Sequence, residues 1–151
     1  MEIVMKISTK GRYALRLMTD LAANNTGLPV SLKDVAKRQG ISDKYLEQII
    51  SVLNKAGYVN SVRGAQGGYQ LRRDAKEYTV GMILRLTEGS LAPVACVEED
   101  GINCDKADAC VTSIVYRKIN DAINSVVDNI TLQDLLDWEE EQTEDAGFYV
   151  I

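Results

Sequence analysis

Apolar and polar residues follow helical spacing in the segment after Ser42. The apolar residues stand at positions i, i+3, i+4 and i+7: Leu46, Ile49, Ile50 and Leu53. The opposite positions are polar: Lys44, Glu47, Gln48, Ser51 and Lys55. Ser42 is suited to cap this helix and Gly57 to end it. The pattern predicts an amphipathic helix with one buried face and one face rich in hydrogen-bonding groups.

Two further helices are predicted before this one. The first covers residues 13–23 and carries four apolar residues on one face: Ala14, Leu17, Met18 and Leu21. The second covers residues 31–38, where Ser31 can cap the helix with Asp34 three residues later. Residues 40–42 then form a tight turn around an apolar residue, which is typical of a helix-turn-helix.

A hairpin is predicted directly after these helices. Residues 58–62 and 68–72 suit two strands, and the glycine-rich tip between them begins with Arg63. A bare tip with one guanidinium group suits a DNA minor groove or a row of phosphates. Three helices and a hairpin make a winged helix-turn-helix. The helix and hairpin alone would equally fit an ordinary amphipathic helix with a surface hairpin.

The second half of the chain predicts three more helices. Thr79 can cap one that ends near Glu88, with Val80, Ile83, Leu84 and Thr87 facing inward. A long helix begins at Thr112 or Ser113 and ends near Asn129, and its apolar stripe is wide: Val111, Ile114, Val115, Ile119, Ala122, Ile123, Val126, Val127 and Ile130. A small domain cannot bury such a stripe, so we expect a dimerisation helix, with a simple core helix as the alternative. Residues 131–134 cap a last short helix that carries Trp138.

These elements predict a mainly α fold: a winged helix-turn-helix with a two-stranded β wing and a long C-terminal dimerisation helix. We expect a DNA-binding domain over residues 1–78. Residues 79–138 would hold a connecting helix, a cysteine loop and the dimerisation helix. Residues 139–151 would form an acidic C-terminal tail.

Charge is divided unevenly along the chain. The net charge of the 151 residues is −5, yet residues 1–75 carry 12 Lys and Arg against 6 Asp and Glu, while residues 76–151 carry 5 against 16. The basic half is the half with the helix-turn-helix, which suits attraction to phosphate. Much of this positive charge comes from Lys6, Lys10, Arg12, Lys33, Lys37 and Arg38. We expect no membrane span and no signal peptide, and therefore a cytoplasmic protein.

The chain has three cysteines, and they lie close together in an acidic loop: Cys96, Cys104 and Cys110. Three thiolates within one loop can converge on an iron–sulfur cluster, zinc or copper(I). The odd count and the expected compartment disfavour a structural disulfide, and three unligated loop cysteines are the plain alternative. The chain has no histidine to act as a base and no nucleotide-binding glycine fingerprint, so we do not expect an enzyme.

Several of these segments resemble the Rrf-two family of bacterial transcriptional regulators. The similar segments are residues 5–14 (MKISTKGRYA), 45–48 (YLEQ), 62–69 (VRGAQGGY) and the cysteine loop through residues 130–132 (ITL). The resemblance is strongest to the iron–sulfur branch of the family. It implies a homodimer that binds a roughly palindromic double-stranded operator, and a two-iron two-sulfur cluster bound by Cys96, Cys104 and Cys110. Together with the residue patterns it predicts DNA contacts from Lys10, Arg12, Ser42, Lys44, Tyr45, Glu47, Gln48, Ser51, Arg63, Gly64, Gln66 and Gly67.

The chain departs from that branch at one position. The iron–sulfur branch has a histidine ligand three residues after its last cysteine, and this position is Ser113 here. The fourth ligand is therefore open: a carboxylate of the loop, a residue donated across the dimer, or an exogenous thiol. A two-iron cluster is favoured over a four-iron cluster, which other members of the family hold with a non-histidine ligand.

A second branch of the family is also similar. Its cysteine-metabolism repressors share the segment 6–13 and an aromatic tail that ends in isoleucine, as residues 147–151 do here. That branch lacks the three cysteines and works with a cysteine synthase. The tail thus suggests a cysteine synthase partner bound through the C-terminus, against the plainer expectation of a disordered tail or one that packs on the dimer.

Overall fold

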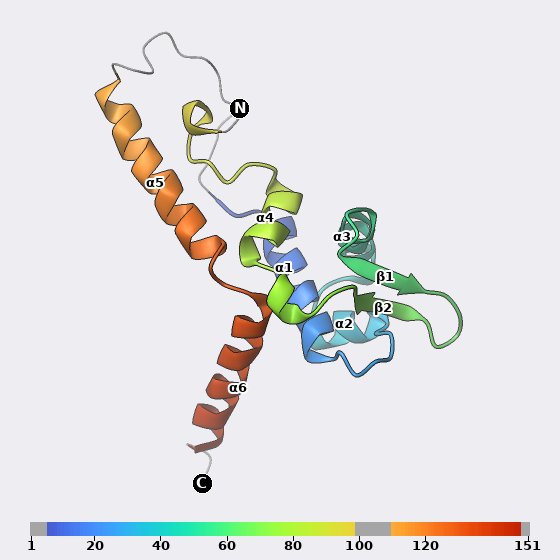
Figure 1. Cartoon of the computed structure of the whole chain (residues 1–151). Coiled ribbons are helices and arrows are strands. Elements are labelled where there is room, and N and C mark those ends of the chain that lie inside the picture. The colour runs from blue at the N-terminus through green and yellow to red at the C-terminus, as the bar shows by residue number, and fades with distance from the viewer. Residues whose placement is uncertain (1–5, 99–109, 149–151) are drawn as a thin grey trace.

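The computed structural model describes residues 6–98 and 110–148. This part of the chain forms six helices and a small hairpin that projects from one side of the molecule, next to α2 and α3 (Figure 1). The elements follow in the order α1 (Thr9–Ala23), α2 (Leu32–Gln39), α3 (Asp43–Lys55), β1 (Val59–Val62), β2 (Gly68–Leu71), the 3-10 turn η1 (Ala75–Glu77), α4 (Val80–Glu88), the 3-10 turn η2 (Ala95–Val97), α5 (Val111–Val127) and α6 (Leu132–Phe148). The mainly helical winged helix-turn-helix is confirmed.

Helix α1 is the centre of the fold, because it contacts α2, α3, α4, α6 and β2. Its four predicted apolar residues are buried, each with at most 1% of its surface exposed: Ala14, Leu17, Met18 and Leu21. The helix begins earlier than predicted, since the Ser8 hydroxyl accepts a hydrogen bond from the Gly11 N–H group. The first turn of α1 is mostly polar, so apolar spacing gave no signal there.

The turn between α2 and α3 has the predicted form. The Ser31 hydroxyl accepts from the Asp34 N–H group at the start of α2. Gly40 ends α2 with a φ of 65°, a left-handed conformation that favours glycine. Ile41 is buried at 5% exposure, and the Ser42 hydroxyl accepts from the Tyr45 N–H group at the start of α3.

A buried carboxylate joins α1 to α2. Asp20 accepts two hydrogen bonds from Arg38, at 2.8 and 3.0 Å, and one from the Gln39 side chain at 2.9 Å. The Asp20 side chain is 2% exposed and that of Arg38 is 40% exposed. The hydrogen bond to Asp20 raises the pKa of Arg38 above its ordinary value. Arg38 was expected to add to the phosphate-attracting charge; instead its guanidinium fixes the supporting helix of the helix-turn-helix.

The base of the wing is held by Tyr78, which is completely buried. Its hydroxyl accepts hydrogen bonds from the N–H groups of Arg72 and Arg73, both at 3.1 Å, and donates one to the Tyr58 carbonyl at 2.7 Å. These bonds join the segment after α3 to the segment that leaves β2. The wing therefore has a fixed orientation relative to α3.

Helices α4, α5 and α6 complete the chain. Thr79 caps α4 as predicted, and Thr131 and Asp134 cap α6 through reciprocal hydrogen bonds. The prediction of a short last helix is wrong, because α6 continues through the acidic run to Phe148 (Figure 1). The acidic run has little apolar content, which is why sequence periodicity did not extend the helix. The division of the chain at residues 78 and 138 stays a prediction.

None of the described helices is both long enough and apolar enough to cross a bilayer.

The Asp20 network predicts the effect of removing one negative charge. In Asp20→Asn, an amide NH₂ group competes with the Arg38 guanidinium and the Gln39 amide for the same space. We expect a loss of about 2 kcal/mol in the free energy of unfolding, measured by urea denaturation. Asp145→Asn removes the same charge at an exposed position of α6. This control should change the free energy of unfolding by less than about 0.5 kcal/mol. Equal effects of the two substitutions would contradict a structural role for this network.

The base of the wing gives a second prediction. Tyr78→Phe leaves the Arg73 N–H group without its acceptor and leaves the Arg72 N–H group with only a long bond of 3.4 Å to the Tyr58 carbonyl. We therefore expect a loss of about 1–3 kcal/mol in the free energy of unfolding. Tyr58→Phe is the matched control, because the Tyr58 hydroxyl bonds to none of the described residues. Thermal or urea unfolding should show the loss for Tyr78→Phe alone.

Candidate nucleic-acid interface and cysteine loop

Helix α3 presents a polar face to solvent. Its apolar residues are buried, with at most 3% exposure: Leu46, Ile49, Ile50 and Leu53. The predicted contact residues of the other face are exposed: Lys44, Glu47, Gln48 and Ser51. Ser42 is also exposed, although its hydroxyl already serves as the helix cap. Four exposed side chains with both donors and acceptors on one helix face can read base edges in a major groove.

An aromatic contact fixes the first turn of α3. Tyr45 packs edge-to-face against Tyr13 of α1, with ring centroids 5.6 Å apart. The Arg16 guanidinium lies 5.4 Å from the centre of the Tyr13 ring, and its Nε atom donates to the Gln39 side chain at 3.2 Å. Tyr13 and Arg16 were not singled out from the sequence, because such contacts join different helices and leave no spacing signal within one.

The wing pairs with the chain that precedes α2. Strands β1 and β2 are antiparallel, with Val62 opposite Gly68. Val30 exchanges two backbone hydrogen bonds with Tyr69, at 2.8 and 2.9 Å. A Cβ atom on Gly68 would lie 2.2 Å from the Val30 carbonyl oxygen, so only glycine allows this approach. The close pairing holds the wing beside α2.

The predicted contact residues of the wing tip are brought together at its end. Arg63, Gly64 and Gln66 are exposed and Gly67 is half-buried. Gly64 has a φ of 118°, and a Cβ atom on Gly67 would lie 2.2 Å from the Val62 carbonyl oxygen. Glycine is therefore required on both sides of the turn.

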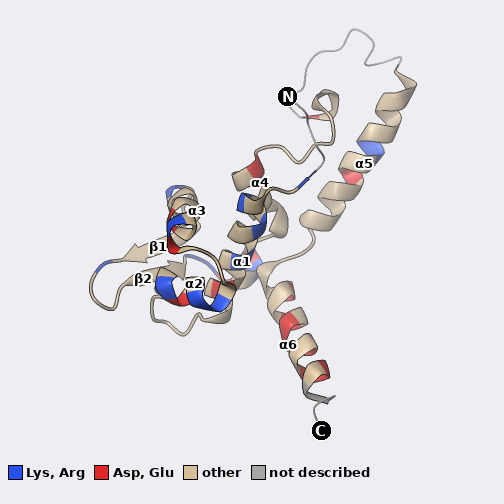
Figure 2. Cartoon of the chain, turned by 180° about the vertical axis from the view of Figure 1, so that it is seen from behind, with Lys and Arg blue, Asp and Glu red and all other residues tan. Residues whose placement is uncertain are grey.

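Lys and Arg gather on the helix-turn-helix and the wing tip, whereas α6 carries Asp and Glu (Figure 2). Near the start of α1, Lys10 is half-buried, and Arg12 is exposed and donates to the Thr9 hydroxyl at 3.0 Å. The wing tip and α3 both carry exposed basic side chains, Arg63 on the wing and Lys44 and Lys55 on α3, and such side chains suit contacts with phosphate.

Two of the three cysteines lie in the described part of the chain. Cys96 is exposed in η2, and Cys110 precedes α5 as its N-terminal cap residue. Cys104 lies outside the described residues. A hydrogen-bonding contact between Cys110 and the Thr112 hydroxyl, at 3.1 Å, is the main cause that lowers the pKa of the Cys110 thiol. The thiolate that this favours is the form that binds metals.

The side chains near Cys96 and Cys110 include ligand types that suit a soft metal ion, but the described residues do not form a complete metal site. Thiolates and carboxylates occur in this segment, and among the described residues no group of three potential ligands converges. Ser113, which replaces the histidine of the iron–sulfur branch, is buried at 6% exposure. Its hydroxyl donates to the Cys110 carbonyl at 2.7 Å and accepts from Arg117 at 3.3 Å. Ser113 is thus engaged in the first turn of α5.

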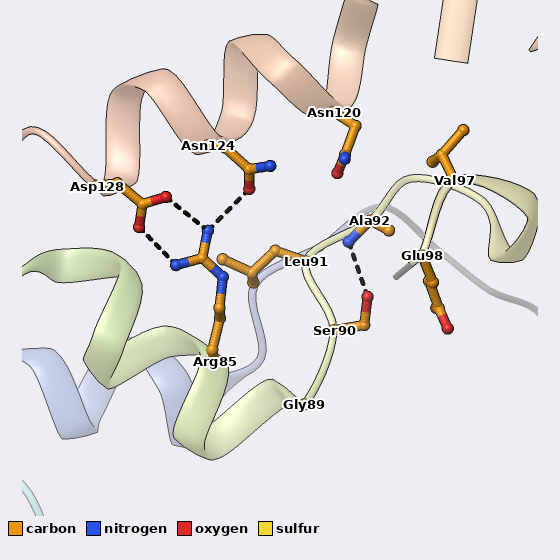
Figure 3. Close-up of a pocket in the computed structure, with 10 residues that line it drawn as sticks. All are labelled: Arg85, Gly89, Ser90, Leu91, Ala92, Val97, Glu98, Asn120, Asn124 and Asp128. Carbon is orange, nitrogen blue, oxygen red and sulfur yellow. Dashed lines mark hydrogen bonds and ion pairs between the residues drawn. The ribbon is translucent and has the colours of Figure 1, made fainter. Parts of the chain in front are cut away.

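A charged junction ties the C-terminal end of α5 to α4 (Figure 3). Arg85 donates to Asp128 at 2.5 and 3.0 Å and to Asn124 at 2.8 Å. These hydrogen bonds lower the pKa of Asp128 below its ordinary value. A Cβ atom on Gly81 would lie 2.2 Å from an Asp128 carboxylate oxygen, so a larger residue there would displace the Asp128 side chain from its present position. A cleft of about 580 Å³ lies beside this junction.

Helix α5 leaves much of its apolar stripe in solvent. Four of its valine and isoleucine residues are more than half exposed: Val111 at 77%, Ile114 at 51%, Val115 at 53% and Val126 at 57%. Within the described chain only Ser113 and Val127 of α5 are buried. This contradicts the alternative of a simple core helix and leaves an apolar face without a partner in the single chain.

The chain matches the family Rrf2, described as an iron-dependent transcriptional regulator, over residues 7–138. It is 42% identical over 132 residues to the protein rrf2 of Nitratidesulfovibrio vulgaris, covering 87% of each chain. It is 40% identical over 136 residues to IscR, an HTH-type transcriptional regulator of Escherichia coli, covering 90% of this chain and 83% of that one.

Solved structures agree with these relatives. CymR of B. subtilis, described as its global cysteine regulator, is 42% identical with a TM-score of 0.75, over 88% of this chain and 97% of that one. IscR of T. potens is 45% identical with a TM-score of 0.73, over 91% and 90% of the two chains. Such relatives are regulators and not enzymes. The chain therefore belongs to the Rrf2 (Rrf-two) family of transcriptional regulators.

Proposed function

We propose that this regulator binds an operator through α3 and the wing, and that its three cysteines adjust this binding. The observation that carries the proposal is the pairing of an exposed polar face on α3 with a basic wing fixed beside it through Tyr78 and Val30. The proposed contacts with base edges in the major groove come from the exposed face of α3: Lys44, Glu47, Gln48 and Ser51. Ser42 and Tyr45, at the start of the same helix, would contact the DNA beside them. The wing tip would enter the minor groove with Arg63, Gly64, Gln66 and Gly67. Phosphate groups would be contacted by Lys10 and Arg12.

The active form is a homodimer joined through α5. The exposed valines and isoleucines of α5 give an apolar face that a second copy of the same face can bury. Two-fold symmetry places two α3 helices on one side of the DNA. The operator is then roughly palindromic, with half-sites about 34 Å apart.

Cys96, Cys104 and Cys110 are the proposed ligands of an iron–sulfur cluster, preferably a two-iron two-sulfur cluster with a fourth ligand from another group. Such a cluster supplies a redox-sensitive, thiolate-bound iron centre when bound. Cys110 stands at the first turn of α5, so a constraint on its sulfur restrains the start of the dimer helix. The Arg85 junction joins α5 to α4, and α4 packs on α1. Ligation can thus alter the spacing of the two α3 helices.

A second candidate is a cysteine-metabolism regulator that acts with a cysteine synthase. The similarity to B. subtilis CymR favours it, as does the apolar chain end at residues 147–151. A third candidate is a regulator in which the same three cysteines bind a zinc ion, which stabilises the fold, and no iron–sulfur cluster.

The DNA-binding part predicts different effects for two side chains. Arg63→Ala should weaken operator binding about five- to tenfold on all sequences, because it removes a charge contact that carries little sequence information. Glu47→Ala should change the order of preference among operators more than the overall affinity. Fluorescence anisotropy on operators selected from random DNA measures both effects, at several salt concentrations.

The charge-matched control is Lys118→Ala, which changes an exposed basic residue of α5. This variant should bind as the unmodified protein does. Binding that is insensitive to salt would contradict the phosphate contacts.

The cysteine part predicts a coloured protein. Purified without oxygen, the dimer should absorb visible light and contain iron and sulfide, and each of Cys96→Ser, Cys104→Ser and Cys110→Ser should remove the absorption. Loss of the cluster should shift operator affinity by about 1–3 kcal/mol. A colourless protein with one zinc ion per chain would support the zinc reading instead. Unchanged affinity in the triple serine variant would show that the cysteines do not regulate binding.

A further inference from the structure

The wing tip places Ala65 and Gln66 at its apex. The Gly67 N–H group donates to the Gly64 carbonyl at 3.0 Å, which closes a four-residue turn around these two residues. Both are exposed. Figure 1 shows the loop between β1 and β2 extending away from the helices. Gln66 therefore stands where a wing would first enter a groove.

The turn that carries Gln66 has a backbone shape that requires glycine at two positions, and it stands on a hairpin that is held at its base. Gly64 adopts a φ of 118°, and any Cβ atom on Gly67 would collide with the Val62 carbonyl oxygen at 2.2 Å. The base of the hairpin is held by Tyr78 and by the backbone pairing of Val30 with Tyr69. A side chain on such a support is positioned more precisely than one on a mobile loop.

The five tip residues, 63–67, include two side chains that can form hydrogen bonds. Arg63 is positively charged and is drawn to the negative potential of a narrow minor groove. Its attraction depends on groove width more than on a particular base. Gln66 is neutral, and its amide offers both a donor and an acceptor. It is the tip residue whose hydrogen bonding can distinguish one base pair from another.

The two kinds of base pair differ in the minor groove by one donor. An A·T pair presents acceptors there, whereas a G·C pair adds the guanine 2-amino group. A glutamine amide can donate to guanine N3 and accept from that amino group at once, but against adenine its carbonyl oxygen finds no donor. We propose that Gln66 is a specificity-determining residue that selects a G·C pair in the minor groove under the wing. This inference rests on the proposed entry of the wing into that groove.

The test exchanges guanine for inosine, which lacks the 2-amino group and leaves the major-groove edge unchanged. Operators are first selected from random DNA, and each guanine is then replaced singly. We expect one position in each half-site where inosine weakens binding of the unmodified protein about tenfold, the order expected for a bidentate contact. The Gln66→Leu variant should bind the guanine operator about tenfold more weakly and lose less than twofold further with inosine. Gln70→Leu, the same change in β2, should keep the full inosine effect.

The outcomes separate the inference from the proposed function. If inosine has the same effect on the unmodified protein and on Gln66→Leu at every guanine, Gln66 reads no base and the inference is wrong, even though Arg63→Ala and Glu47→Ala still alter binding. If no operator is selected at all, both the function and the inference fail. Thermal unfolding of Gln66→Leu should match the unmodified protein, because Gln66 is exposed.

Discussion

The Tyr78 hydroxyl joins the two segments of the chain that follow α3 and the wing strand β2. It accepts hydrogen bonds from the N–H groups of Arg72 and Arg73, which follow β2, and donates one to the carbonyl of Tyr58, which follows α3. Because the ring is completely buried, no water can replace these bonds at low cost. The angle between α3 and the wing depends on these bonds together with the pairing of Val30 and Tyr69. The proposed contacts of both parts with neighbouring grooves require that this angle is kept.

Charged groups in this protein are divided between holding the fold and facing outward. Arg38 is paired with the buried Asp20, and Arg85 with Asp128, so neither guanidinium is available to phosphate in the same way as Lys44 or Arg63. The two pairs lie at junctions between helices: α1 with α2, and α4 with α5. A count of basic residues in the sequence therefore overstates the charge offered to DNA. The acidic residues of α6 lie apart from the basic face (Figure 2).

Periodicity and capping residues predicted the helices of this fold well, because each of those signals lies within one segment. Ser31, Ser42 and Thr79 cap the helices as expected, and the buried stripe of α3 is the predicted one. The contacts between elements were not predictable: the Tyr78 bonds, the Asp20 network and the packing of Tyr13 on Tyr45 join distant parts of the chain. For the candidate site, the exposed positions of α3 and the wing tip were predicted from the sequence. The convergence of the cysteines stays a prediction, because Cys104 lies outside the described residues.

The close approach of backbone at Gly67 and Gly68 limits how this surface can change over evolution or in the laboratory. A side chain at either position would strike a carbonyl oxygen 2.2 Å away, and Gly64 needs a conformation that other residues rarely adopt. Within the four-residue turn 64–67, substitutions are thus restricted to positions 65 and 66. If Gln66 selects a base pair as proposed, a relative with another residue at position 66 would keep the same scaffold and prefer different promoters.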